Sequence, residues 1–255
     1  MVPVSPSLFH QDARQPNNMI PDAFGQHRAN NLQVLFGYSA LYNALQADAG
    51  KSSYQATADS SLGATNPTSG TFDVNSANAK ALGLLGASST LDGYIGVSSA
   101  LPFEYNQTAS SGNYDAIAMV QHELTEDMGR VGSVGAVIGN GVYTPLDLFR
   151  YTSTDNADPA DGTPERALTQ QGPNTDYFSI NGGVTNLGDY NASNSSADYA
   201  DWNANTMGSD PFGDAFAGVT QPMSGNDAIE VAAIGWDLTA KGTTLAQSAT
   251  DKTLV

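Results

Sequence analysis

The sequence contains no cysteine, so no disulfide bond holds its loops together. Basic residues are also scarce, because 9 Lys and Arg stand against 26 Asp and Glu and leave a formal net charge of −17. A surface with this charge repels phosphate backbones and anionic lipid head groups. We therefore expect neither nucleic acid nor a membrane among the partners of this protein.

Long hydrophobic runs are missing as well. Apolar stretches are interrupted by Gly, Ser or Asn before they reach the length of a membrane-spanning helix. The N-terminal segment, MVPVSPSLFHQDARQPNN, has neither the basic start nor the apolar core of a signal peptide. The lack of cysteine is compatible with a cytosolic protein and with a secreted one whose loops are held by metal ions.

The 255 residues, of which 40 % are hydrophobic, are enough for one large domain or two closely packed halves. Residues 1–31 are rich in proline and show little periodicity, which predicts an irregular arm. Strands are predicted at Leu32–Tyr38, Thr71–Val74 and Asp92–Ala100, and helices at residues 39–50 and Ser76–Gly86. Residues 51–70 are predicted to be mostly loop. This mixture indicates an α+β fold.

The strongest helical signal is the stretch YDAIAMVQHELTEDMGRVG, from Tyr114 to Gly132. Asn113 is the expected N-cap, and Gly129 is placed to end the helix. After Gly132 the pattern dissolves into Gly, Asn, Asp, Ser and Pro, and helical spacing returns only near the end, in SGNDAIEVAAIGWDL. There Ile229, Ala233 and Trp236 share one stripe.

Within the central helix, His122 and Glu126 are four residues apart and therefore lie on one face. Two ligands one turn apart, with the carboxylate of Glu123 beside them as a base, are the arrangement of zinc hydrolases. The alternative is a solvated acidic face. Against it, residues 116–120 are almost all apolar, which predicts a buried helix in which unpaired charges would be costly.

A third metal ligand has to come from elsewhere in the chain. The other two histidines, His10 and His27, both lie in the predicted arm. We therefore expect a distant carboxylate from the irregular segment.

Five segments, in chain order, resemble a bacterial family of secreted metzincin-like metallopeptidases. The resemblance covers about Tyr38 to Leu238, and its segments are HELTEDMGR, YTPLDLFRYTS, YFSINGGVTNLGDYN, YADWN and SGNDAIEVAAIGWDL. It implies a zincin-like α+β fold with a small twisted sheet, an active-site helix and an irregular C-terminal half. It also implies that the strand at Tyr94–Ser98 is an edge along which an extended substrate pairs.

Carried over to this chain, the resemblance makes His122 and Glu126 metal ligands and Glu123 the general base. Asp201, which precedes Trp202, becomes the third ligand, and Met223 becomes the methionine of the turn below the site. Asp147 is the second choice for the third ligand. The pattern PLDLFRY also suggests a buried ion pair between Asp147 and Arg150.

One imidazole and two carboxylates suit Zn²⁺, although oxygen ligands also make harder divalent ions competitive. The two carboxylates would formally neutralise the ion and raise the pKa of its water. A second ion, Ca²⁺, is considered for the segment STDNADPADGTPE, where Asp155, Asp158 and Asp161 recur at three-residue intervals. The alternative for this segment is an exposed acidic turn.

The sequence therefore predicts a secreted, zinc-dependent endopeptidase acting on peptide or protein substrates. Four regions are expected: an arm at 1–31, an upper subdomain at 32–132 with the active-site helix, a loop-rich lower subdomain at 133–240, and a tail at 241–255. The competing hypothesis is a non-catalytic secreted binding or surface protein built on a decayed metallopeptidase scaffold. Substrate specificity and oligomeric state do not follow from the sequence.

Overall fold

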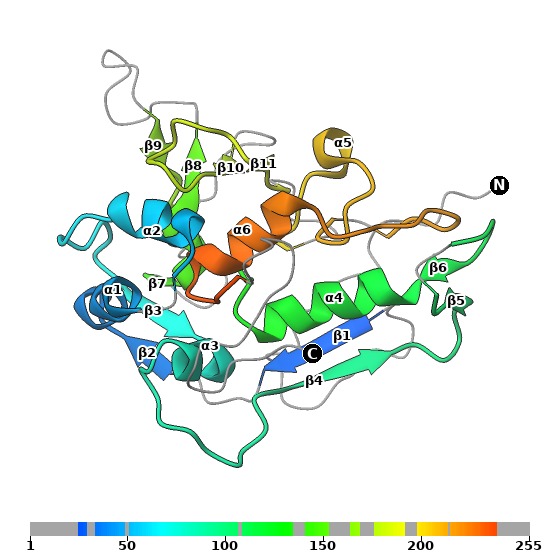
Figure 1. Ribbon diagram of the computed structural model, residues 1–255, viewed down its shortest axis with the longest axis horizontal. Coiled ribbons are helices and arrows are strands. Elements are labelled where there is room, and N and C mark those ends of the chain that lie inside the picture. The colour runs from blue at the N-terminus through cyan, green and yellow to red at the C-terminus, as the bar shows by residue number, and fades with distance from the viewer. Residues whose placement is uncertain are drawn as a thin grey trace.

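The computed structural model describes residues 25–29, 34–48, 51–106, 109–134, 141–152, 164–168, 176–191, 198–213 and 215–238 (Figure 1). This part of the chain is a mixed α+β structure. Its helices are α1 (Tyr38–Ala47), α2 (Ser53–Ser60), α3 (Ser76–Ala81), α4 (Ala116–Asp127), α5 (Ala204–Met207) and α6 (Gly225–Ala233), with one 3-10 turn, η1 (Pro145–Phe149). Within these residues, none of the helices combines the length and the apolar content that crossing a bilayer would require.

Among the described residues, the strands are short and form four small sheets. One sheet pairs β1 (Gly25–Ala29) with β4 (Gly93–Val97), and another pairs β5 (Phe103–Glu104) with β6 (Tyr114–Asp115). A third has the order β2 (Val34–Phe36), β3 (Thr71–Val74), β7 (Val142–Tyr143). The fourth, within the segment predicted to be loop-rich, has the order β11 (Gly188–Asp189), β10 (Asp176–Phe178), β8 (Arg150–Thr152), β9 (Glu165–Arg166).

The hydrophobic core connects these elements. Leu41 and Leu45, one turn apart on α1, are both fully buried and pack with Phe72 of β3 and with Ile234 at the end of α6. This confirms the predicted helix, which begins at Tyr38 rather than after a cap at Ser39. The predicted strand Thr71–Val74 is also confirmed.

Helix α4 is positioned by its N-cap. The carboxylate of Asp115 accepts hydrogen bonds from the amides of Ile117 (3.0 Å) and Ala118 (3.2 Å). The predicted cap at Asn113 is wrong, because Tyr114 and Asp115 first pair in β6 and the amide side chain of Asn113 binds Glu104 (2.8 Å) instead. The helix ends as expected at Gly129, whose φ of +110° favours glycine.

Helix α6 lies beside α4 in Figure 1. Ser224 and Asp227 form a capping box at its start, and the predicted stripe of Ile229, Ala233 and Trp236 is buried. The indole nitrogen of Trp236 donates to the carbonyl of Met128 at the C-terminus of α4 (3.0 Å).

Two segments predicted to lack regular structure contain a strand or a helix. The first is the irregular arm at 1–31, which is wrong at Gly25–Ala29, because these residues form β1 and pair antiparallel with β4. This segment is a strand because its backbone pairs with β4, so its own sequence pattern does not predict the strand. The other residues of the predicted arm lie outside the described part of the chain. The second is the segment 51–70, predicted to be mostly loop. Ser53–Ser60 form α2 there, whereas the rest of the segment has no helix or strand. The buried face of α2 contains Gln55 and Asp59, so it lacks the apolar period that marks an ordinary helix.

Candidate metal centre

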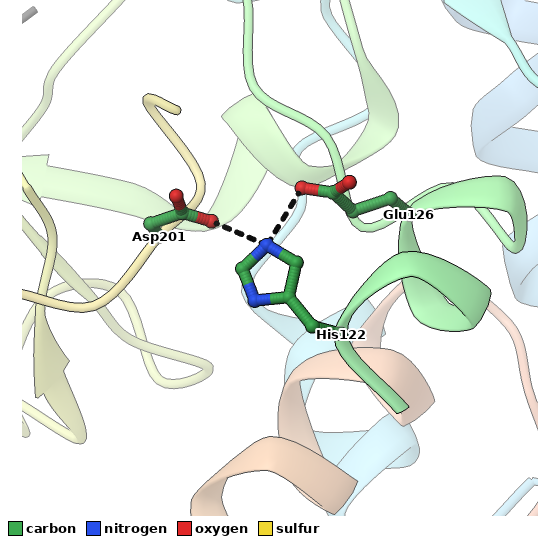
Figure 2. Close-up of side chains that lie close together, drawn as sticks. All are labelled: His122, Glu126 and Asp201. Carbon is green, nitrogen blue, oxygen red and sulfur yellow. Dashed lines mark ion pairs between the residues drawn. The ribbon is translucent and has the colours of Figure 1, made fainter. Parts of the chain in front are cut away.

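His122 and Glu126 lie one turn apart on the same face of α4, and both are completely buried. The Nε2 atom of His122 is 3.2 Å from Oε1 of Glu126 (Figure 2). On its other side, Nδ1 lies 2.7 Å from the carbonyl oxygen of Pro211. A carbonyl can only accept, so Nδ1 carries the proton in this contact and the imidazole presents Nε2 to the carboxylates.

Asp201 approaches this face from a loop far downstream in the sequence. Its Oδ1 lies 3.4 Å from Nε2 of His122, and its Oδ2 accepts a hydrogen bond from the amide of Asp198 (2.9 Å). The next residue, Trp202, is buried, pairs with the backbone of Phe212 (2.8 Å) and stacks on Tyr190 with ring centroids 5.1 Å apart. The anchored indole thus fixes the loop that holds Asp201.

The structure therefore brings together the three side chains that the sequence assigned as ligands: His122, Glu126 and Asp201. One possible ligand atom from each lies within 4.8 Å of the others. An imidazole nitrogen and two carboxylate oxygens are competent ligands for Zn²⁺, and the hydrogen bond at Nδ1 supplies the orienting contact that metal-bound histidines use. On donor chemistry and spacing, the group fits a divalent cation.

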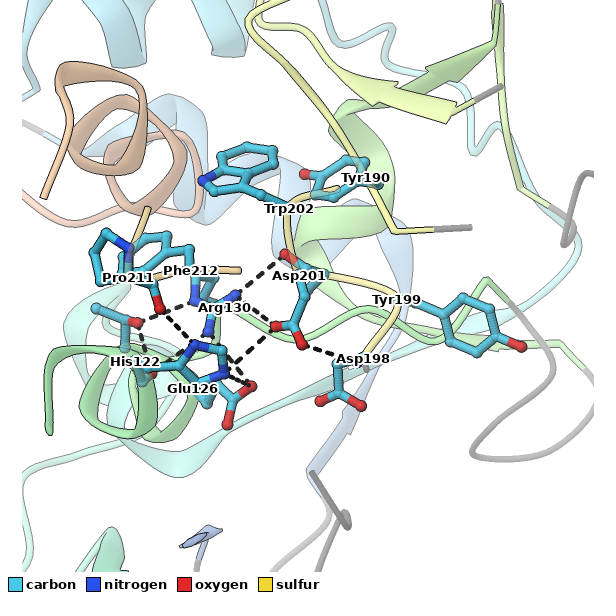
Figure 3. A network of polar contacts seen from close by, with 12 residues as sticks. His122, Glu126, Arg130, Tyr190, Asp198, Tyr199, Asp201, Trp202, Pro211 and Phe212 are labelled. Atoms are coloured by element: carbon cyan, nitrogen blue, oxygen red, sulfur yellow. Dashed lines mark hydrogen bonds and ion pairs between the residues drawn. The ribbon is translucent and has the colours of Figure 1, made fainter. Parts of the chain in front are cut away.

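Arg130 is a fourth member that the sequence interpretation did not assign. Its guanidinium reaches Oε1 of Glu126 (3.4 Å) and Oδ1 of Asp201 (3.3 Å), so it bridges the two carboxylates (Figure 3). It also donates to the hydroxyl of Thr125 (3.0 Å) and stacks over Phe212, 4.3 Å from the ring centroid. The available sequence signal was its position four residues after Glu126.

Electrostatics couple these four groups. Burial lowers the pKa of His122, but the carboxylates of Glu126 and Asp201 outweigh that effect and raise it to about 9. Burial raises the pKa of Asp201 to about 6, against the opposing attraction of His122 and Arg130. With His122 protonated, two cations and two carboxylates balance, so a metal ion entering at neutral pH has to displace the imidazole proton.

Arg130 changes the charge count predicted for a metal-loaded site. Neutral His122, two carboxylates and a divalent cation sum to zero, and the guanidinium adds one positive charge. The expected rise in the pKa of the bound water therefore does not follow from the ligand set alone. Ionised Glu123 would restore neutrality.

Glu123 follows His122 on α4 and is only 1 % exposed. Successive helical residues are rotated by about 100°, so Glu123 lies beside the face that carries His122 and Glu126. It also precedes Asp127 by one turn. The backbone thus places Glu123 between the metal-ligand face and the side of α4 that carries Asp127.

Two further buried carboxylates, Asp227 and Glu230, contact the aromatic residues that anchor the Asp201 loop. The indole of Trp202 donates to Asp227 (2.8 Å), and the hydroxyl of Tyr190 donates to Glu230 (2.8 Å). Burial raises the pKa of Asp227 to about 7 and that of Glu230 to about 8. Sequence analysis missed these two carboxylates because their helix, α6, was interpreted only through its apolar stripe.

Asp147, the second choice for the third ligand, belongs to a different environment. Its buried carboxylate accepts hydrogen bonds from the amides of Ser133, Val134 and Thr144, at 2.8 to 3.2 Å. It caps η1 and is not a member of the His122 group. The ion pair predicted with Arg150 is wrong, since Arg150 pairs with Asp176 at 3.4 Å.

The remaining predicted site residues are not joined to this group. Met223 is half-buried and packs against the hydrophobic core, so its role beneath a metal stays a prediction. The proposed calcium ligands Asp155, Asp158 and Asp161 lie outside the described residues.

No protein-family model, no curated protein and no solved structure matches this chain. The resemblance to secreted metzincin-like metallopeptidases therefore stays a hypothesis based on the quoted segments, and the candidate site has to be judged on its own geometry.

Proposed function

We propose that this protein is a metal-dependent endopeptidase with a zincin-like site on α4. The observation that carries the proposal is the meeting of Asp201 with His122 and Glu126, whose candidate ligand atoms lie within 4.8 Å of one another. Two of these ligands share a helix face, and the third is delivered by a distant loop. Secretion of the protein belongs to the same proposal and rests on the sequence resemblance.

In this function His122, Glu126 and Asp201 hold the ion, and a divalent cation bound there supplies Lewis acidity to a peptide carbonyl and to water. Glu123 accepts a proton from the attacking water at its carboxylate and returns it to the leaving amine. The Pro211 carbonyl fixes the imidazole, and Arg130 orients both ligand carboxylates. Zn²⁺ is the favoured ion, and the oxygen-rich set also admits harder divalent cations.

A second candidate function is a non-catalytic binding or surface protein in which this group is a structural centre. The observation that favours it is the metal-free charge balance: His122 and Arg130 already neutralise Glu126 and Asp201, and all four are buried. Such a network can fix a unique packing without any catalysis.

One experiment separates the two functions. Purified protein is assayed for bound metal and for chelator-sensitive cleavage of unstructured casein, alongside the Glu123→Gln variant. The endopeptidase proposal expects metal in both proteins and cleavage only in the parent. Asp59→Asn is the matched control, because Asp59 is an equally buried carboxylate on α2 that pairs with Lys51 (2.8 Å) away from the site. Metal without cleavage in the parent would favour the non-catalytic binding protein, and neither metal nor cleavage would favour a purely structural centre.

A further inference from the structure

The peptide bond between Asp210 and Pro211 lies in a buried turn that belongs to no helix or strand. Asp210 is 5 % exposed, and the next three residues, up to Gly213, are buried as well. Pro211 touches the candidate metal centre through its carbonyl, which contacts the ring of His122 (Figure 3). The polar contacts of this turn converge on the Asp210–Pro211 bond.

The side chain of Asp210 is folded back along this bond. Its Oδ1 accepts a hydrogen bond from the amide of Phe212, two residues ahead in the chain, at 2.9 Å. The ring closed by this contact, an Asx-turn, contains the carbon and the nitrogen of the Asp210–Pro211 bond. The carboxyl group is therefore held beside its own main-chain carbonyl carbon, where it can act as an intramolecular nucleophile.

The main-chain carbonyl of Asp210 accepts two hydrogen bonds. The side-chain amide of Gln221 donates to it at 3.0 Å, and the backbone amide of Gly213 donates at 3.1 Å. Gln221 is buried, and its own Oε1 accepts from the amide of Phe216 (3.2 Å), so the donor is fixed in place. Two fixed donors polarise this carbonyl and can stabilise an oxyanion that forms on it.

A second carboxyl group lies within hydrogen-bonding reach of Asp210. It belongs to Asp227, near the start of α6, and the hydroxyl of Ser224 also reaches Asp210. Two carboxyl groups can hydrogen-bond to each other only when they share a proton. Burial raises the pKa of Asp210, and burial together with the charge of Asp210 raises the pKa of Asp227 to about 7. A nucleophilic carboxylate and a proton are thus present together at this bond.

From these contacts we propose that the chain cleaves itself between Asp210 and Pro211. The Asp210 carboxylate attacks its own main-chain carbonyl carbon, and Gln221 and Gly213 stabilise the resulting oxyanion. The carbon–nitrogen bond then breaks, its electron pair stays on the Pro211 nitrogen, and the proton shared with Asp227 passes to that nitrogen. Because the bond is a tertiary amide, the leaving group is a secondary amine. Water opens the five-membered anhydride left on Asp210, so the net reaction is hydrolysis of one peptide bond.

Cleavage at this position divides the segment that completes the candidate metal centre. Asp201 stays on the fragment 1–210, whereas Pro211, whose carbonyl contacts His122, begins the fragment 211–255. The two fragments should stay associated, because the residues of α6 are buried in the hydrophobic core. The inference does not depend on the proposed peptidase activity, since no metal ligand takes part in the reaction.

Self-cleavage is tested on the purified full chain, kept folded at neutral pH with a chelator, by denaturing gel electrophoresis and intact mass. We expect the fragments 1–210 and 211–255, with masses that sum to that of the parent plus one water. The sequence contains a second pair of this type, Asp158–Pro159, which is an internal reference for the dipeptide itself. Cleavage should be confined to Asp210–Pro211 in the folded protein and should reach both bonds at similar rates in acidic urea.

Variants identify the chemistry. Asp210→Ala should abolish cleavage, and Gln221→Met, which keeps the length but loses the donor, should slow it by about 10²-fold. Gln55→Met is the matched control and should cleave like the parent, because Gln55 is an equally buried amide that donates to Asp48 (2.8 Å) between α1 and α2. Glu123→Gln should also cleave like the parent. The two glutamine variants decide the question even if Asp210→Ala fails to fold.

The outcomes separate self-cleavage from the peptidase proposal. Cleavage that stops in chelator or in Glu123→Gln would be autolysis by the peptidase and would overturn the inference. An intact folded chain, equal cleavage at both Asp-Pro bonds, or equal rates in the two glutamine variants would overturn it as well. Fragments that form at the same rate with chelator, while metal-loaded protein leaves casein uncut, would support self-cleavage and reject the peptidase.

Discussion

Replacing Arg130 by methionine should lower the stability of the metal-free protein and raise its affinity for zinc. Arg130 bridges Glu126 and Asp201 at 3.4 and 3.3 Å and is fully buried. Methionine keeps much of the volume but leaves two buried carboxylates without that partner. Breaking a buried ion pair in this way costs about 3–5 kcal/mol of unfolding free energy.

For a chain of this size, a loss of 1 kcal/mol lowers the Tm by about 2–4 °C, so metal-free Arg130→Met should melt roughly 6–20 °C below the parent. The affinity for zinc should change in the opposite direction and increase. Unit charges about 6 Å apart attract or repel by roughly 3 kcal/mol at an effective dielectric constant near 20. Removing the guanidinium should therefore raise zinc affinity at least about tenfold, and with it the zinc-induced rise in Tm.

Arg166→Met is the matched control, because the guanidinium of Arg166 donates to the carbonyl of Ser61 (2.8 Å) and lies over the ring of Tyr151, 5.0 Å from its centroid, and both partners are outside α4 and the loop that carries Asp201. It should lower the Tm of the metal-free protein without changing the response to zinc. The assay is thermal denaturation of chelator-treated protein titrated with zinc. An equal zinc response in the two variants would refute the view that Arg130 competes with the ion, and no response in any protein would refute the metal centre.

Three further predictions concern the surrounding carboxylates. Glu123→Gln should reduce casein cleavage by about 10²–10⁴-fold while metal content stays at the parent level; retained cleavage would remove Glu123 as the base. Asp201→Ala should lower zinc affinity by orders of magnitude in a metal titration, whereas Asp147→Ala should keep the affinity and lose about 3 kcal/mol of stability with its amide contacts; the reverse result would exchange their roles. Burial raises the pKa of Glu230 from 4.5 to about 8, so the folded state holds a proton that the unfolded state releases, and stability falls as the pH rises through this window. Glu230→Gln should consequently gain in Tm over the parent at pH 8 but not at pH 4.5, and a difference independent of pH would contradict the shift.

The part of the site that could be predicted is the part encoded locally. His122 and Glu126 follow from helical spacing, since positions four apart share a face in any α-helix. Asp201 could be assigned only through its place before Trp202 in the resemblance, because no local spacing connects it to α4. The structure accounts for the contact by anchoring Trp202 in the core.

Arg130 and β1 could not be predicted for a common reason. Arg130 lies four residues after Glu126, but the chain leaves the helix at Gly129, where φ is +110°, so this spacing by itself does not predict the contact between the two side chains. Gly25–Ala29 likewise form a strand because their backbone pairs with that of β4. In both cases the position is decided by a tertiary partner, which side-chain periodicity cannot reveal.

The two tryptophans give this molecule an optical reporter at each end of the candidate centre. Trp202 adjoins Asp201 and is held by Asp227, while the indole of Trp236 is bonded to Met128 where α4 ends. The chain contains no other tryptophan. Its tryptophan fluorescence therefore originates entirely from two side chains that contact the elements holding the site. A change in the ligand loop or at the end of α4 can thus be followed in the unmodified protein by selective excitation of tryptophan, without an added dye.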